Sequence, residues 1–347
     1  MPLQCAPPLV ICIPVRDETR RLPALIQALA EQRDGAPFGV CLLFDGPQPD
    51  CRDRAIEQAR AARLTLYHDS IARQKRSNAG RARRAAMALG LATLGDAADG
   101  LILTTDADCR PAPDWVAANR AALAEVDIVA GHIRREPLPA HRRRDRLERY
   151  LERLYTLERT LDPITYEPPP GHPSIGGASL GFRASVYRAL GGFATLAAGE
   201  DTDLVQTARR LGFWVRRDHQ VRVETSSRLF GRARGGLADE LRRSKYAPSA
   251  SERVERPAEV AARYEACAAA RRAFTGDSRA YGFLADRCAV GIRELHALVH
   301  ESPSADAFAL LIESRWPAAR RIDLVTAEAE LARLLPYPLG GADNEAV

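Results

Sequence analysis

Two aspartates one residue apart follow an apolar run of the chain, and this pair is the feature best suited to chemistry. The run is residues 101–105, and the pair is Asp106 and Asp108, followed by Cys109. Just past a strand end, where the chain turns out of a sheet, both carboxylates can converge on one hard divalent cation. Such a cation suits a phosphorylated ligand, so the pair indicates chemistry on a diphosphate. An Asp-rich turn without metal has the same pattern, so the rest of the chain must decide.

Composition places the chain among ordinary globular α/β proteins. Its 347 residues, 46% hydrophobic and 27% charged, are enough for one large domain or two modest ones. No apolar stretch approaches the roughly 20 residues that span a bilayer, and the N-terminus lacks the pattern of a secretion signal. We therefore expect a cytoplasmic protein, with peripheral contact at the inner face of the membrane left open.

Cysteine and charge patterns argue against a disulfide framework, a zinc cluster and nucleic-acid binding. The seven cysteines include no C-x-x-C pair, which favours reduced thiols over disulfides or a zinc cluster. Cys109 is expected to be a small packing residue. The net charge of +5 is modest, and no basic tract is interleaved with aromatic residues, so no nucleic-acid partner is indicated.

Apolar runs alternate with amphipathic stretches in the first half, which predicts a mostly parallel sheet covered by helices on both faces. The predicted strands are residues 9–15, 40–44, 64–68, 101–105 and 128–133, and the predicted helices are 22–32, 51–62, 78–94 and 113–124. Ligands bind beyond the carboxyl ends of such strands. Polar groups follow these ends: Arg16, Asp17 and Glu18 after the first, and Asp45 with Gly46 after the second. A helix cap and a tight turn are the structural alternatives for these two groups.

The second half begins with a predicted helix at 142–161 that carries one apolar stripe. A Pro/Gly-dense loop at 168–177 follows, then a strand at 178–182 and a short helix at 184–190. Glu200, Asp201 and Asp203 open a further helix that ends near residue 211, where helix capping alone would require fewer acids. From about residue 237 the pattern is helical, most clearly at 258–274 and 279–299, and residues 336–347 are expected to be a frayed tail.

Six motifs occur in an order and spacing that resemble family 2 glycosyltransferases of the GT-A fold. They are Pro-x-Arg-Asp-Glu at 14–18, Asp-Gly at 45–46, Gly-x-Ala-Arg at 80–83, Asp-Ala-Asp at 106–108, Gly-Gly-Ala-Ser at 176–179 and Glu-Asp at 200–201. The resemblance covers roughly residues 9–236. It implies an α/β Rossmann-like sheet in a domain of residues 1–236, with 1–135 binding the nucleotide sugar and 136–236 the acceptor, followed by a helical extension at 237–347.

The resemblance also implies the donor site. It assigns Pro14, Arg16, Glu18 and Asp45 to the nucleoside, and Lys75 or Arg83 to the base or phosphate. Asp106 would meet ribose or metal, and Asp108 would coordinate Mn²⁺ or Mg²⁺. Arg228, Arg232 or Arg234 would close onto the diphosphate.

For the acceptor side, the resemblance assigns Asp201, with Glu200 beside it, to the general base of an inverting displacement. Gly177 and Ala178 would wall the acceptor site, and His219 is a candidate third metal ligand, with a surface loop as its alternative. The acceptor would be a hydroxyl-bearing sugar, lipid-linked glycan or small metabolite.

One departure from the family pattern narrows the reaction. The Gln-x-x-Arg-Trp run and the membrane helices of processive relatives are missing. The chain is therefore similar to soluble bacterial members, and transfer of a single sugar is expected.

Three alternatives to transfer remain at this stage: a catalytically silent GT-A binding or scaffold module, a sugar nucleotidyltransferase and a phosphatase with an Asp-x-Asp nucleophile. The two acidic pairs argue against the first. A nucleotidyltransferase would need a Gly-rich loop after the first strand, where residues 14–18 stand instead. A phosphatase would carry its Asp-x-Asp motif after that first strand.

Overall fold

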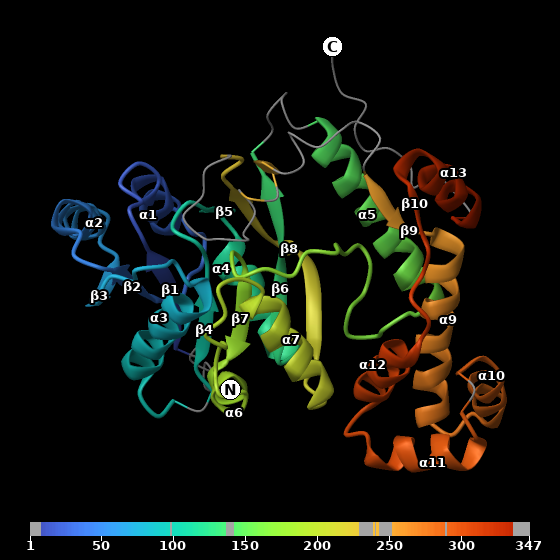
Figure 1. Ribbon diagram of the computed structural model, residues 1–347. Coiled ribbons are helices and arrows are strands. Elements are labelled where there is room, and N and C mark those ends of the chain that lie inside the picture. Colours follow the sequence, from blue (N-terminus) through green and yellow to red (C-terminus); the bar gives the residue numbers. More distant parts are fainter. Residues whose placement is uncertain are drawn as a thin grey trace. The chain divides into compact units, whose positions relative to one another are not determined.

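The structure, a computed structural model, describes residues 8–97, 99–136, 142–228, 239, 241–242, 252–288 and 290–335 (Figure 1). Its internal contacts divide the chain into two compact units. The first comprises Met1–His141, Pro170–Arg209 and Phe213–Lys245, and the second comprises Arg142–Pro169, Arg210–Gly212 and Tyr246–Val347. The helix at 142–161, which the sequence analysis includes in the predicted domain of residues 1–236, lies in the second unit. The predicted domain boundary at residue 236 remains a prediction.

The first unit is built on an eight-stranded sheet with the order β3-β2-β1-β4-β7-β6-β8-β5. Its strands are β1 (Leu9–Val15), β2 (Gly39–Asp45), β3 (Thr65–Ile71), β4 (Leu101–Thr104), β5 (Arg110–Pro111), β6 (Ile128–Arg135), β7 (Leu180–Arg183) and β8 (Val215–Thr225). The pairs β3-β2, β2-β1, β1-β4 and β6-β8 are parallel, whereas β7 runs antiparallel to both its neighbours and β5 runs antiparallel to β8. The predicted mostly parallel sheet is confirmed.

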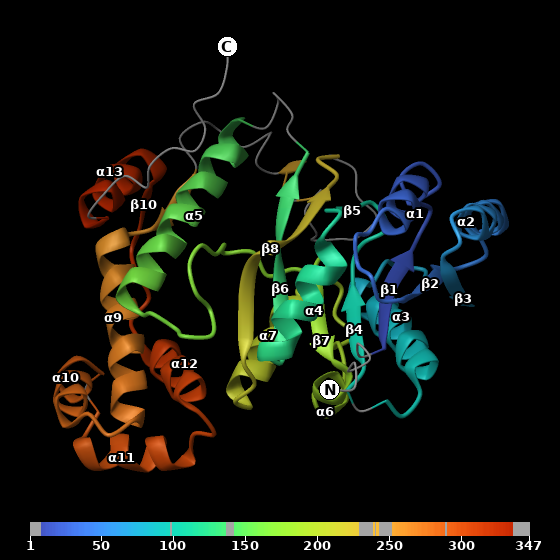
Figure 2. The ribbon, with the colours of Figure 1, turned by 180° about the vertical axis from the view of Figure 1, so that it is seen from behind.

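Helices cover both faces of this sheet. They are α1 (Leu22–Ala30), α2 (Pro49–Ala61), α3 (Ala79–Leu94), α4 (Trp115–Glu125), α6 (Ala184–Ala189) and α7 (Glu200–Arg210). One buried cluster joins apolar residues of α3, α6 and α7 to one face of β1, β2, β4, β6 and β7. The helices α1 and α4 lie on the opposite face, as the two views show (Figures 1 and 2).

Strand direction brings the polar segments to one edge of the sheet. Cys12 of β1 pairs with Thr104 of β4, and Val15 pairs with Phe44 of β2, so these parallel strands end at the same edge. Because β7 is reversed, its first residue, Leu180, pairs with Thr104. The segment before β7 therefore lies beside the carboxyl end of β4, at the same edge of the sheet as the carboxyl ends of β1 and β2.

Strand β8 is the main element missing from the sequence prediction. Its segment carries two arginines, an aspartate, a histidine and a glutamine in its first six residues, and only Val215 among them is buried. This first part lacks the apolar alternation by which strands are recognised in a sequence, and only residues 221–225 alternate buried and exposed side chains. β8 ends at Thr225, three residues before Arg228.

The second unit is mainly helical, as predicted. Its elements are α5 (Arg142–Leu161), β9 (Arg253–Glu255), α9 (Pro257–Phe274), α10 (Ser278–Cys288), α11 (Ile292–Glu301), α12 (Ala305–Arg315), β10 (Arg321–Asp323) and α13 (Leu324–Leu334). The predicted stretch at 279–299 is wrong as one helix, since α11 starts anew after Gly291. The short pair β9-β10 was also not predicted. Within the described ranges, no helix is both long and apolar enough to cross a bilayer.

Close packing of α3 on β1 depends on a glycine. A Cβ atom added at Gly90 would lie 2.2 Å from the Sγ atom of Cys12 and 3.1 Å from Cδ1 of Ile102. Both side chains are fully buried. Helix α3 can therefore approach the sheet this closely only without a side chain at this position.

We predict that Gly90→Ala lowers the free energy of unfolding. Alanine favours a helix by about 1 kcal/mol over glycine, but overpacking a core costs about 1–3 kcal/mol. Urea unfolding followed by circular dichroism measures the net change. Removing the Cys12 sulfur in Cys12→Ala should turn the same glycine substitution into a stabilising one.

Gly282→Ala in α10 is the control for Gly90→Ala. No atom lies within 4 Å of the added Cβ at Gly282, so this variant should keep or gain stability. An equal increase in the free energy of unfolding for Gly90→Ala and Gly282→Ala would contradict the packing argument.

Candidate active site

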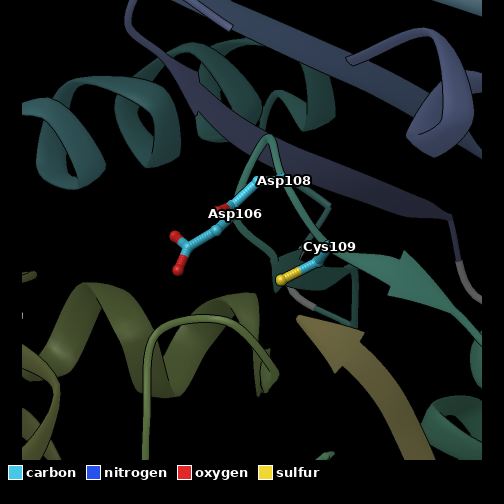
Figure 3. Close-up of side chains that lie close together, drawn as sticks. All are labelled: Asp106, Asp108 and Cys109. Atoms are coloured by element: carbon cyan, nitrogen blue, oxygen red, sulfur yellow. The ribbon is translucent and has the colours of Figure 1, made fainter. Parts of the chain in front are cut away.

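The turn after β4 gathers three groups that could hold a metal ion. Ligand atoms of Asp106, Asp108 and Cys109 lie within 4.8 Å of one another, and Figure 3 shows all three side chains on this turn. Cys109 is buried, and burial with the two neighbouring carboxylates raises the pKa of its thiol. A hard divalent cation takes carboxylate oxygen in preference to thiol sulfur, so the two carboxylates are the candidate ligands. This oxygen donor set fits Mn²⁺ or Mg²⁺.

Asp108 lies in a crowded, mostly buried position. An Arg228 nitrogen is 2.9 Å from its Oδ2 atom, and the other terminal nitrogen of Arg228 lies 2.6 Å from Oε2 of the buried Glu18. Burial raises the pKa of Asp108 to about 6; Asp106 and Glu18 act in the same direction, whereas Arg228 opposes the rise. Arg228 therefore supplies the positive charge beside the candidate metal ligand.

Arg83, from α3, connects the metal-binding turn to the start of α7. Its guanidinium donates hydrogen bonds to Asp106 (2.9 Å), Glu200 (3.1 Å), the Thr104 hydroxyl (3.1 Å) and the Gly177 carbonyl (2.7 Å). The residue is only 5% exposed. Burial acts to lower its pKa, but Asp106 and Glu200 outweigh burial and raise it, so the guanidinium remains charged.

The two acids at the start of α7 occupy different environments. Glu200 is buried, and burial raises its pKa against the opposing effect of Arg83. Asp201 is partly exposed, and its Oδ2 atom accepts a 2.8 Å hydrogen bond from the Gly177 amide. Of the two predicted residues, Asp201 is therefore the one that can both meet a substrate and hold a fixed orientation.

A second polar cluster lies where β1 and β2 end. The carboxylate of Asp45, 2% exposed, accepts hydrogen bonds from the Arg16 guanidinium (2.8 Å), the backbone N–H of Gln74 (3.0 Å) and the side-chain Nε2 of Gln74 (3.2 Å). Gln48 donates to the carbonyls of Val15 and Asp45, joining the two strand ends. The sequence prediction found Asp45 and Arg16 but missed both glutamines.

Comparison of the sequence with models of protein families identifies the family of the chain. The model of glycosyl transferase family 2 matches residues 10–189, just over half of the chain and the part that contains both polar clusters. The chain belongs to glycosyltransferase family 2. The GT-A-like fold predicted from the resemblance is confirmed.

Several solved structures are similar to this glycosyltransferase. The mannosyltransferase PcManGT from Pyrobaculum calidifontis, in complex with GDP-Man and Mn²⁺, is 17% identical with a TM-score of 0.46, covering 89% of this chain and 86% of that one. S. aureus TarS 1–349 in complex with UDP-GlcNAc is 14% identical with a TM-score of 0.47, covering 89% and 90%. Glucosyl-3-phosphoglycerate synthase from Mycobacterium tuberculosis in complex with phosphoglyceric acid is 16% identical with a TM-score of 0.40, covering 69% and 76%. None of the curated proteins matches the sequence.

The remaining residues predicted for the site make none of the hydrogen bonds described above for the Asp106–Asp108 turn and the Asp45 cluster. Pro14 is half-buried in β1, and Lys75 is exposed beside Gln74. Ala178 is buried next to Gly177. Arg232 and Arg234 lie outside the described residues.

His219 is not part of the cluster formed by Asp106, Asp108 and Cys109. It lies where the register of β8 shifts, between Asp218, which pairs with Gly131, and Arg222, which pairs with His132. Glu224, the partner of Arg110 just after the cluster, is five residues further along β8. Residues 219–221 fall in this irregular part of the ladder, so regular strand spacing does not give the distance from His219 to the cluster. His219 as the third metal ligand stays a prediction from the resemblance.

Asp108→Asn should stabilise the metal-free glycosyltransferase at pH 8 by about 3 kcal/mol, since one pKa unit corresponds to about 1.4 kcal/mol. The folded protein raises the pKa of Asp108 from 3.8 to about 6, so ionisation above pH 6 costs the folded state. Below pH 3.8 both states are protonated, and the cost disappears. Urea unfolding in the presence of a chelator should therefore show a smaller gain at pH 5 than at pH 8. The same gain at both values would refute the electrostatic cause.

Proposed function

We propose that this glycosyltransferase moves a single sugar from a nucleotide diphosphate sugar to an acceptor hydroxyl, in a metal-dependent, inverting reaction with Asp201 as the general base. The observation that carries the proposal is the connection between the two acidic pairs. Arg83 bonds to Asp106 and to the Gly177 carbonyl, and the Gly177 amide bonds to Asp201. These bonds support a single site, at the carboxyl edge of the sheet, that the donor-side and acceptor-side carboxylates would share.

Asp106 and Asp108 would hold the divalent cation, Mn²⁺ or Mg²⁺. When bound, it would neutralise the charge that develops on the departing diphosphate. The two carboxylates would supply the hard oxygen ligands, and the buried Cys109 beside them would serve as a small packing residue. The Asp45 cluster, with Arg16 and Gln74, would orient the nucleoside, because its buried groups are already fixed by hydrogen bonds to one another.

The Asp201 carboxylate would accept the proton of the acceptor hydroxyl as the oxygen attacks the anomeric carbon. A new carbon–oxygen bond forms there, the bond to the diphosphate oxygen breaks, and the nucleoside diphosphate leaves with the electron pair. One base on the side opposite the leaving group is sufficient for this displacement, which inverts the anomeric centre. The hydrogen bond from the Gly177 amide keeps Asp201 oriented toward the acceptor.

We predict that Asp108→Asn and Asp201→Asn separate binding from turnover. Asp108→Asn removes a charged ligand and should abolish Mn²⁺-dependent binding of a nucleoside diphosphate. Asp201→Asn keeps an oxygen for the Gly177 amide but no base, so it should retain donor affinity while kcat falls by roughly 10²–10⁴. Calorimetry and a transfer assay over a panel of nucleotide sugars measure the two effects. Wild-type binding by Asp108→Asn would refute the metal assignment.

Arg228→Gln should change metal and nucleotide affinity in opposite directions. Without nucleotide, Arg228 neutralises Asp108, so its removal should tighten Mn²⁺ binding several-fold, equivalent to about 1 kcal/mol for a partly exposed pair. With a nucleoside diphosphate, Arg228 is expected to contact the phosphates, so the ternary complex should weaken. Manganese titration by electron paramagnetic resonance measures the first change.

Arg222→Gln is the control for Arg228→Gln, because it also removes one positive charge. Arg222 pairs with the exposed Asp114 instead of Asp108. It should therefore leave both affinities unchanged. If the two variants behave alike, net charge and not the Arg228–Asp108 pair accounts for the effect.

A further inference from the structure

A chain of protein hydrogen bonds links the candidate metal ligand to the candidate base. It runs from Asp106 to the Arg83 guanidinium (2.9 Å), on to the Gly177 carbonyl (2.7 Å), and from the Gly177 amide to Asp201 (2.8 Å). The carbonyl and the amide belong to the two peptide planes that meet at the Gly177 Cα atom. Movement of the guanidinium therefore changes the position of the amide that holds Asp201.

Gly177 is required by the closeness of this contact. A Cβ atom added there would lie 2.2 Å from Cζ and 2.3 Å from Nη2 of Arg83. The guanidinium thus lies directly against the backbone of the segment before β7. This explains the glycine by the position of Arg83, in addition to the acceptor wall predicted from the sequence.

The guanidinium itself is held from several directions. Its remaining bonds go to the Thr104 hydroxyl and to Glu200, and the Phe193 ring lies 5.8 Å from its Cζ atom. Four acceptors around one planar group use the fixed fork of arginine, which the single ammonium group of lysine cannot reproduce. With 5% exposure, Arg83 has most of its donors committed to the protein and not to a substrate.

We propose that Arg83 is a positioning residue, which sets the place of Asp201 relative to Asp106 through the Gly177 backbone. This role rests on the proposed function, since it assumes that Asp106 is a metal ligand and Asp201 is the base whose relative positions Arg83 sets. The role differs from a direct contact of Arg83 with the donor base or phosphate. Substitution of a positioning residue should lower kcat and leave donor affinity unchanged, whereas substitution of a donor contact should weaken donor binding and leave kcat unchanged.

Arg83→Lys tests the role, with Arg84→Lys as the matched control. Lysine retains the buried positive charge, so the protein should fold. Because misplacement of a reacting group by about 1 Å can cost on the order of 10²-fold, kcat at saturating donor should fall by about that factor. The calorimetric Kd for nucleoside diphosphate and Mn²⁺ should change little.

Arg84, the next residue of α3, donates to the Phe193 carbonyl and contacts neither acid in any described hydrogen bond. Its lysine variant should keep kcat, whatever its thermal stability. A loss of kcat in proportion to stability in both variants would overturn the proposal. So would an Arg83→Lys enzyme with weakened donor binding and an unchanged kcat, because that result places Arg83 on the donor.

Two further variants keep the proposal testable if Arg83→Lys does not fold. Gly177→Ala displaces the guanidinium while all its donors remain, and Thr104→Val removes one hydroxyl and retains the shape of the side chain. Each should lower kcat without weakening donor binding, the second by about fivefold, the value of a typical hydrogen bond. Unchanged kcat in either folded variant would overturn the positioning role. Absence of transfer by the wild-type enzyme with every nucleotide sugar would instead refute the proposed function.

Discussion

The attraction between one buried guanidinium and two carboxylates holds the site together. Arg83, Asp106 and Glu200 come from α3, from the turn after β4 and from α7, and they meet where the sheet ends. Removing these charges from water costs several kcal/mol for each ion, and the cost is offset only when geometry and hydrogen bonds are good. Four hydrogen bonds from Arg83 satisfy this condition. Loss of Arg83 would remove the ion-pair partner of both carboxylates, of which Glu200 is buried, so α7 and the turn after β4 both depend on α3.

The negative charge beside this network is compensated only in part. Asp108 and Glu18 share Arg228, and the burial that raises the pKa of Asp108 to about 6 reflects an unfavourable site for a carboxylate. Ligand sites in proteins are often destabilised in this way, because groups arranged for a ligand repel one another without it. The apo protein thus holds stored repulsion that a cation at the Asp106–Asp108 turn would relieve.

Much of this arrangement was predictable from sequence, and the rest depends on contacts between distant segments. β1 and α5 have the predicted limits, and the acids at 106, 108, 200 and 201 lie at element ends as expected. These features come from local patterns of apolar and acidic residues. β8 was missed because its polar residues conceal a strand that is stabilised by pairing with β6. The hydrogen bond from Arg83 to the Gly177 carbonyl joins residues 94 positions apart in the sequence, so no local sequence pattern predicts it.

The reversed strand β7 has a consequence for how members of such a fold can diverge. Its first residue pairs with the last residue of β4, so the backbone ladder itself sets the spacing between the Asp106 turn and the Gly177 segment. The connection that precedes this segment includes α5, and its length does not enter that spacing. Insertions there would lengthen the chain between β6 and β7 and still preserve the distance between the Asp106 turn and the Gly177 segment.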